Sequence, residues 1–213
     1  MGIKPGKPRS RQSLRRKSQN RSSRYYVLIV CEGAETEPTY FKALCAHLQL
    51  GGKVKIAGKE CQSAPIKVIE YANREKKNAE RDRNPYDAAW AVVDRDQHGR
   101  MEQAIEKALS CDITLALSVP CFEFWLLLHQ QYTTRPFADC TELKTKVEQL
   151  AGNTAPDKYI AELATGETLR EVAKRNARRV TEHHENLSSS SLPNPSTQIH
   201  ELVESLEALA ARL

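Results

Sequence analysis

The sequence predicts an α/β fold in which a mainly parallel sheet is flanked by helices and followed by a helical C-terminal extension. Two short apolar runs, residues 25–31 and 88–93, have the length and composition of strands that are buried on both faces. From residue 25 to about residue 130, strand patterns alternate with helical patterns, which is typical of a parallel sheet with crossover helices. After the strand pattern at 112–118, only helical patterns continue.

Four strands and three helices are expected in the first part of the chain. The helix after the first strand carries apolar residues at three- and four-residue spacing, and Gly51 and Gly52 end it. Pro65 stands near the start of the next helix, where its missing amide hydrogen removes no helical bond. The strands are expected at residues 25–31, 53–57, 88–93 and 112–118, and the helices at 37–50, 65–79 and 99–110.

The C-terminal part is expected to contain helices alone. Asp139 or Thr141 is placed to cap one of them, and residues 188–195 form a Ser- and Pro-rich break before the last. The helices are expected at residues 121–131, 139–150, 157–164, 168–186 and 197–212. The expected division is a basic arm at 1–24, an α/β domain at 25–130 and a helical extension packed on it at 131–213.

The composition is that of a water-soluble protein. Hydrophobic residues make up 40% of the 213 residues, and no apolar run approaches the roughly 20 residues of a membrane span. The basic N-terminus lacks the apolar stretch of a secretory signal. The six cysteines contain no CxxC pair, so we expect buried reduced thiols rather than a zinc site or disulfides. These features predict a cytoplasmic protein.

Positive charge is concentrated at the N-terminus. Residues 1–24 contain nine basic and no acidic side chains, although the net charge of the whole chain is only +5. Such a segment cannot bury enough apolar surface to fold, so we expect a disordered arm. It either contacts nucleic acid through its basic side chains or serves as a solubilising or partner-docking tail. The candidate nucleic-acid contacts are Arg11, Arg15, Arg16, Lys17 and Arg21.

Acidic residues follow both apolar runs. Glu32 and Glu37 come after the first run, and Asp94 and Asp96 come after the second. Open parallel sheets bind ligands at the carboxyl ends of their strands, so these four carboxylates can meet there. A hard cation relieves their mutual repulsion, and oxygen-rich sites of this kind suit Mg²⁺ or Mn²⁺. The sequence therefore predicts a metal-dependent enzyme that acts on phosphates.

All four carboxylates are candidate metal ligands, and Glu32, Asp94 and Asp96 are also candidate catalytic residues. Two ions about 3.5–4 Å apart can stabilise both the attacking and the leaving oxygen of a phosphodiester. Glu32 is our candidate for general base or acid, shared with metal binding. Glu37 has an alternative interpretation, because an acid near a helix start is favourable for the helix dipole alone.

This pattern resembles the TOPRIM fold, a Rossmann-like fold found in topoisomerases, bacterial primases and OLD-type nucleases. That family carries a Glu-Gly pair after its first strand and an Asp-x-Asp motif after a later strand. Glu32-Gly33 and Asp94-Arg95-Asp96 match these motifs. The resemblance implies a metal site built from these acids.

Three other residues bear on the resemblance. The OLD-type pattern has a second acid after the Glu-Gly pair, which supports Glu37 as a ligand. The third acid of the fuller pattern is replaced by His98, which either ligates metal or contacts phosphate, or is an ordinary loop residue. Glu123 stands inside an apolar segment, where a buried carboxylate needs a metal or a basic partner. It is therefore a possible site residue.

Four segments carry a closer resemblance over nearly the whole folded part. They are VLIVCEGAETEPTYF at 27–41, VVDRDQ at 92–97, SVPCFEFWLLLH at 118–129 and NPST at 194–197. They resemble the RloB-like proteins, bacterial TOPRIM-related proteins that are often encoded beside an ABC-type ATPase in phage-defence systems. The resemblance implies a nuclease-type effector that cuts RNA such as tRNA, or DNA, and that has such an ATPase as a possible partner.

A second hypothesis belongs to another class. The chain would be a regulatory subunit that binds nucleic acid and an ATPase without cutting. The sequence contains no GxxxxGK[ST] or GxGxxG loop, so we do not expect it to hydrolyse ATP by itself. The two hypotheses differ in whether the acidic residues are essential.

Overall fold

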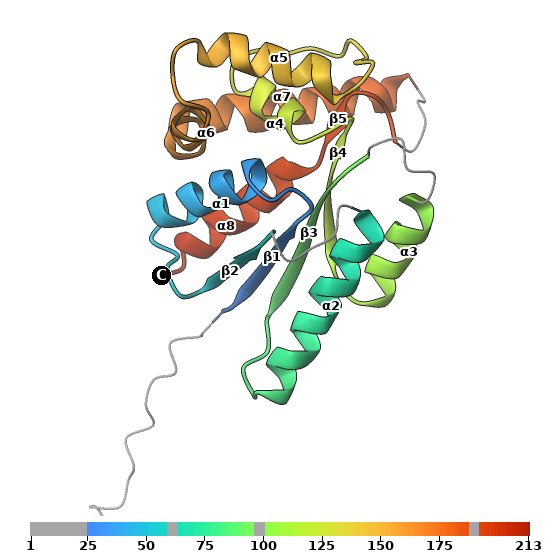
Figure 1. Cartoon of the computed structure of the whole chain (residues 1–213), viewed down its shortest axis with the longest axis vertical. Helices are drawn as coiled ribbons and strands as arrows, with labels where there is room; N and C mark the ends of the chain where they lie inside the picture. The colour runs from blue at the N-terminus through green and yellow to red at the C-terminus, as the bar shows by residue number, and fades with distance from the viewer. Residues whose placement is uncertain (1–24, 59–63, 96–100, 188–191) are drawn as a thin grey trace, which may run out of the picture.

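The computed structural model describes residues 25–58, 64–95, 101–187 and 192–213 (Figure 1). The predicted basic arm at 1–24 lies wholly outside these ranges, and the predicted four-carboxylate site lies partly within them. The candidate residues outside the described ranges are Arg11, Arg15, Arg16, Lys17, Arg21, Asp96 and His98.

The strands of the described ranges form one sheet in the order β2-β1-β3-β4-β5 (Figure 1). The first four run parallel to their neighbours, and β5 is antiparallel to β4. This arrangement confirms the expected α/β fold with a mainly parallel, Rossmann-like sheet. The strands are β1 (Val27–Cys31), β2 (Val54–Ala57), β3 (Ala88–Asp94), β4 (Thr114–Val119) and β5 (Ser196–Thr197).

β1 is buried along its whole length because helices cover both faces of the sheet. Val27, Ile29 and Cys31 belong to the apolar cluster on one face, and Leu28 and Val30 belong to the cluster on the other. Successive side chains of a strand point to opposite faces. A strand covered on both sides therefore shows the continuous apolar run seen in the sequence rather than an alternating pattern.

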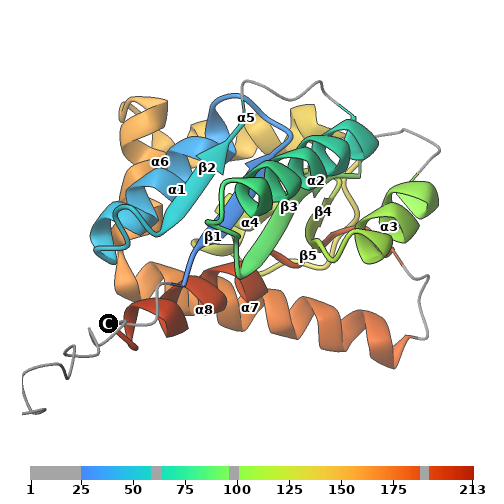
Figure 2. The ribbon, with the colours of Figure 1, turned by 90° about the horizontal axis from the view of Figure 1, so that it is seen from below.

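Two helices cover one face of the sheet, as Figure 1 and the turned view of Figure 2 show. They are α2 (Pro65–Arg81) and α3 (Met101–Ser110). α2 begins at the expected proline and buries Val68, Ile69 and Ala72 against the sheet. These residues have the three- and four-residue spacing of an amphipathic helix.

The other face is covered by α1 (Thr36–His47) and α8 (Ile199–Ala210), and the remaining helices pack beside and outside them (Figure 1). Those helices are α4 (Glu123–Leu128), α5 (Cys140–Ala151), α6 (Pro156–Thr165) and α7 (Glu167–Asn186). One apolar cluster joins this layer to the sheet, with Ile29 of β1, Trp125 of α4 and Leu206 of α8 among its members. The division of the chain at residue 130 stays a prediction.

The expectation that the C-terminal part contains helices alone is wrong, because β5 adds a short strand to the sheet. Thr197 pairs with Ser118 of β4, and their hydroxyl groups are hydrogen-bonded at 2.9 Å. The backbone amide of Gln198 continues the contact by donating to the carbonyl of Leu117. The last helix therefore begins at Ile199, two residues later than expected.

Helix α4 is shorter than the expected span of residues 121–131. The segments on either side of it are turns, in which the amide of Phe124 donates to the carbonyl of Cys121 and the amide of Gln130 donates to that of Leu127. The expected cap of α5 is confirmed, because the Asp139 side chain accepts hydrogen bonds from the amides of the first turn. Within the described ranges, none of the helices combines the length and the apolar character that a membrane crossing requires.

Salt bridges connect α8 to α7. Glu207 accepts from Nε of Arg170 at 3.0 Å and from Nζ of Lys174 at 2.5 Å. The side chains of Arg170 and Lys174 are only 4% and 7% exposed. The second charged pair between these helices, Arg178 with Glu204, is much more exposed.

We predict that Glu207→Ala destabilises the protein by about 2–3 kcal/mol, because it leaves two buried cations without this carboxylate. Lys174 keeps its contact with Glu171, which limits the loss. Glu204→Ala is the matched control and should cost at most about 1 kcal/mol, as exposed pairs do. Urea denaturation of both variants measures the difference. Equal losses in the two variants would contradict the structural role assigned to Glu207.

Candidate functional site

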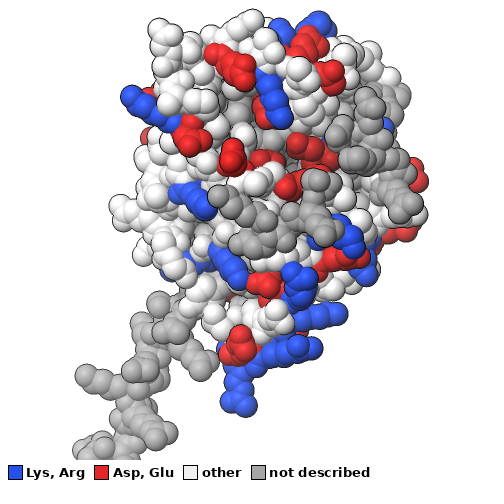
Figure 3. Space-filling model, viewed as in Figure 1, with Lys and Arg blue, Asp and Glu red and all other residues white. Residues whose placement is uncertain are grey.

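Three of the four predicted carboxylates, those of Glu32, Glu37 and Asp94, meet at the carboxyl ends of the parallel strands, and Asp96 lies outside the described residues. Glu32 follows β1 directly, Asp94 is the last residue of β3, and Glu123 opens α4 after β4. A pocket of about 440 Å³ lies here. Its polar lining includes Glu32, Glu35, Glu37, Asp94, Cys121, Glu123, Cys140 and Lys144. Acidic side chains gather across the middle of the corresponding face in Figure 3.

Glu32 forms hydrogen bonds that connect the end of β1 to the end of β3. Its backbone amide donates to the carbonyl of Val92 at 2.9 Å, which extends the ladder between β1 and β3 by one residue. Its Oε2 atom accepts a hydrogen bond from the backbone amide of Asp94 at 3.1 Å. The side chains of Glu32 and Asp94 therefore start from adjacent points on the sheet edge, as the sequence predicts.

Glu37 belongs to the site as well as to the first turn of α1. Its carboxylate folds back over the preceding loop and accepts from the backbone amide of Gly33 at 3.1 Å. A β-carbon at position 33 would lie 2.1 Å from Oε2 of Glu37. The glycine of the Glu-Gly pair thus leaves room for this carboxylate, and Glu37 is only 5% exposed.

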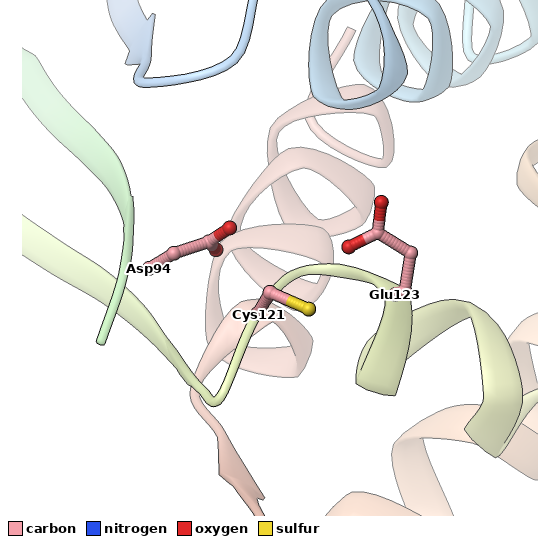
Figure 4. A group of neighbouring side chains, drawn as sticks. All are labelled: Asp94, Cys121 and Glu123. Carbon is pink, nitrogen blue, oxygen red and sulfur yellow. The ribbon is translucent and has the colours of Figure 1, made fainter. Parts of the chain in front are cut away.

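Asp94, Cys121 and Glu123 form the tightest group of the site. One side-chain oxygen or sulfur atom from each lies within 4.8 Å of the others. Figure 4 shows the Asp94 and Glu123 carboxylates pointing toward one another, with Cys121 beside them. The Oδ1 atom of Asp94 is shielded from solvent and accepts no hydrogen bond from the described residues. A carboxylate oxygen that is buried without a hydrogen-bond donor is stabilised by a cation or by a proton.

Lys144 is the basic side chain among the described residues that line this pocket. Its Nζ atom lies 3.9 Å from Oε1 of Glu123, and its side chain is 60% exposed. The sequence left open whether Glu123 joins the carboxylates or pairs with a basic side chain. In the structure Glu123 does both, because it lies beside Asp94 and also contacts Lys144. Glu123 raises the pKa of Lys144, so the ammonium form is favoured. One exposed ammonium group cannot neutralise the whole cluster.

The carboxylates raise one another's pKa. Burial is the largest cause for Asp94, followed by the charges of Glu37, Glu123 and Glu32, and the pKa of Asp94 lies well above its usual range. The pKa of Glu37 is raised by burial and by the charges of Glu123 and Glu32, against the lowering effect of its backbone hydrogen bonds. Both shifts mean that the ionised cluster is unfavourable unless a cation offsets the charge.

The sequence did not identify Cys121, Cys140 and Lys144 as site residues. The cysteines of the described ranges form no disulfide, as expected, and Cys121 is buried, whereas Cys140 and Cys111 are partly exposed. A hydrogen bond to Cys140 is the largest cause that raises the pKa of the Cys121 thiol. Cys121 could have been found, because a residue just after β4 must lie at the same sheet edge as Glu32. No local sequence pattern indicates that Cys140 or Lys144 belongs to the site. Both lie on α5, and the packing of that helix places them at the pocket.

We predict that Asp94→Asn stabilises the metal-free protein by about 1 kcal/mol at neutral pH, because it removes a buried charge from a repulsive cluster. This would raise Tm by about 2–4 °C for a chain of this size. The Asp94 pKa is raised in the folded state, so the native protein holds a proton that the unfolded chain has lost. The wild-type stability should therefore fall as pH rises above the ordinary carboxyl range and through the raised pKa.

Thermal denaturation in EDTA across this pH range tests the prediction, and the gain from Asp94→Asn should shrink toward about pH 4, where the unfolded carboxyl is itself half-protonated. Asp112→Asn is the matched control, because Asp112 is fully exposed in its contact with Lys76 and has a φ of 52° that asparagine adopts readily. A lower Tm for Asp94→Asn at neutral pH would contradict the repulsion argument.

A comparison with known protein families places this chain in a family. A family model described as RloB-like protein matches residues 27–206, which include every described site residue. Searches of curated proteins and of solved structures found no significant match. Because the family model covers most of the chain, this protein belongs to the RloB-like protein family.

Proposed function

We propose that this protein is a divalent-metal-dependent nuclease of the TOPRIM type, which cleaves phosphodiester bonds in RNA such as tRNA or in DNA. The observation that carries the proposal is the buried carboxylate cluster at the strand ends, where Oδ1 of Asp94 is shielded from solvent and no described residue donates to it. Such a cluster costs stability, and a cation bound as part of the function would offset that cost.

The side chains present fit a divalent ion. Asp94 and Glu123 would hold it directly, with Glu37 and Glu32 beside them in the same pocket. Bound Mg²⁺ or Mn²⁺ would polarise a phosphoryl oxygen and lower the pKa of a coordinated water. Asp96 remains a proposed ligand from the sequence, because it lies outside the described residues.

Other residues of the pocket would position the phosphate and move protons. Lys144 stands at the rim with an exposed ammonium group, which suits contact with a phosphate oxygen as a point charge. Glu32 is the proposed general base or acid, because the Asp94 amide fixes the orientation of its carboxylate. The pocket volume of about 440 Å³ is in the range of small-ligand sites, so it admits the reacting part of a nucleic acid.

The biological setting is proposed from the family resemblance. It comprises an effector role in bacterial phage defence and an ABC-type ATPase as partner. The basic side chains of residues 1–24 are the proposed contacts to the nucleic-acid backbone. The alternative is a subunit that binds nucleic acid without cutting it. The following experiment distinguishes it from a nuclease.

We predict that the purified full-length chain cuts labelled tRNA or DNA in Mg²⁺ or Mn²⁺ and not in EDTA. Asp94→Asn should lower the rate by about 100-fold or more, because loss of a ligand should exceed the roughly 10–100-fold effect of residues that only support ligands. Asp112→Asn, at an exposed aspartate far from the pocket, should cut like the wild type. Gel analysis of end-labelled substrates measures all three.

If the wild type cuts nothing, the assay is repeated with the neighbouring ABC-type ATPase and ATP. Cleavage under that condition that Asp94→Asn abolishes would support a latent nuclease. Absence of cleavage there, together with nucleic-acid binding that Asp94→Asn leaves unchanged, would contradict the nuclease proposal and favour a binding subunit.

We predict that Gly33→Ala weakens Mn²⁺ binding by about 10-fold while leaving the fold intact, comparable to the loss of a residue that supports metal ligands. The added β-carbon would collide with the Glu37 carboxylate, which is the movable end of a flexible side chain. Gly51→Ala is the matched control, because a β-carbon there meets no atom of the described residues within 4 Å. Calorimetric titration with Mn²⁺ gives the affinities.

The effect of Gly33→Ala should disappear when Glu37 is already Gln, since the two changes act on the same carboxylate. Additive losses in the double variant would show that Gly33→Ala acts by another route, and would contradict the role given to Glu37.

A further inference from the structure

We propose that Cys121 supplies a thiolate ligand to the ion held by Asp94 and Glu123, so that this site prefers a first-row transition ion such as Mn²⁺ or Zn²⁺ over Mg²⁺. This inference rests on the metal-binding part of the proposed function. It adds the class of ion that the site prefers and a sulfur ligand that the carboxylate motifs do not contain. It arises from the position of Cys121 after β4, at the same sheet edge as the acids.

The spacing of the three groups suits a mixed site. An oxygen and a sulfur ligand at about 2.0 and 2.3 Å from one ion lie roughly 3.5 Å apart when the angle between them is tetrahedral. The side-chain atoms of Asp94, Cys121 and Glu123 already lie within 4.8 Å of one another. Small side-chain rotations would bring all three onto one ion. Figure 4 shows Asp94 at the end of β3, opposite Cys121 and Glu123 on the stretch that leads from β4 into α4.

Two of these groups have features of ligands rather than of ordinary core residues. Oδ1 of Asp94 is shielded and accepts no hydrogen bond from the described residues, and Glu123 is only 9% exposed. Cys121 itself is 1% exposed, and it follows the buried C-terminal end of β4. Cys121 belongs to an apolar cluster, but its sulfur also lies within 4.8 Å of oxygens of the Asp94 and Glu123 carboxylates, a position that packing alone does not require.

The chemistry of sulfur decides which ion is preferred. Mg²⁺ takes oxygen ligands in near-octahedral geometry and keeps several waters, so a thiolate ligand adds little to its binding affinity. Thiolates favour softer ions, and affinity for a given site rises from Mn²⁺ toward Zn²⁺. Cys140 would orient the ligand, because its thiol is hydrogen-bonded to Cys121 and it is fixed at the first residue of α5.

Co²⁺ alone is the probe for this proposal, because a thiolate bound to Co²⁺ gives a near-ultraviolet charge-transfer band that carboxylates do not. The protein is the full chain with Cys61 and Cys111 replaced by serine, kept reduced and stripped of metal. Cys111 is remote from the site, and Cys61 lies outside the described residues. We expect the band in this parent protein and in the Cys140→Ser variant, and its loss in Cys121→Ser.

Competition experiments then test the preference. Cys121→Ser should reduce the ratio of Mn²⁺ to Mg²⁺ affinity by about 10-fold, which corresponds to about 1.4 kcal/mol. Asp94→Asn should weaken the binding of every ion, both when Cys121 is present and when it is replaced by serine. Cys121→Ala is the second variant if the serine variant does not fold, because it also removes the sulfur.

Two spectroscopic outcomes would overturn the proposal. Co²⁺ binding without a charge-transfer band, or a band that survives in Cys121→Ser, would exclude Cys121 as a ligand. Binding without the band would leave a carboxylate-only centre, so the proposed nuclease would survive while this inference fails. Absence of any metal binding would overturn both, and a band in a protein that cuts no nucleic acid would support the metal site alone.

Discussion

The shared carboxyl edge of the parallel strands is the constraint on which the candidate site depends, because it brings mutually repelling carboxylates together. Neighbouring strands lie roughly 4.8 Å apart, so acids that end β1 and β3 are brought close by the sheet itself. Glu32 accepts from the Asp94 amide, and Glu37 accepts from Gly33, so each is held by a backbone donor instead of moving into solvent. The apolar clusters beneath give the sheet the rigidity to keep these groups together. The fold therefore holds mutually repelling carboxylates close together, at a cost in stability.

The C-terminal helices build one wall of the site and do more than cover the sheet. α4 carries Glu123, and its end is held by Asn176 of α7, which donates to the carbonyl of Leu128 at 2.8 Å. α5 contributes Cys140 and Lys144. α7 in turn is fastened to α8 through Glu207. A chain of contacts thus connects the last helix to the position of Glu123, although these residues are far apart in the sequence.

Local patterns in the sequence were sufficient for much of this structure. The parallel strands, the amphipathic helices, the Asp139 cap and the meeting of Glu32, Glu37 and Asp94 follow from hydrophobic periodicity and from the rule that parallel strands share one carboxyl edge. β5 was missed because two residues carry no periodicity, and their pairing depends on Ser118, about 80 positions away. Cys140 and Lys144 were missed for a related reason, since the packing of α5 on α4 places them. Glu123 was found only through its burial in an apolar segment and the family resemblance.

The distribution of charge adds a last requirement to the proposed function. The described pocket presents several carboxylates and the ammonium group of Lys144, so by itself it repels a polyanion. A phosphodiester can approach only when a divalent ion offsets part of this charge and other cations hold the rest of the polymer. The nine basic residues at 1–24 are the chain's densest source of such cations. Phosphate contacts made by Lys and Arg weaken steeply with salt, whereas an ion buried among carboxylates is screened much less. Under the proposed function, salt should therefore weaken substrate binding far more than metal binding, which separates the contribution of the basic segment from that of the site.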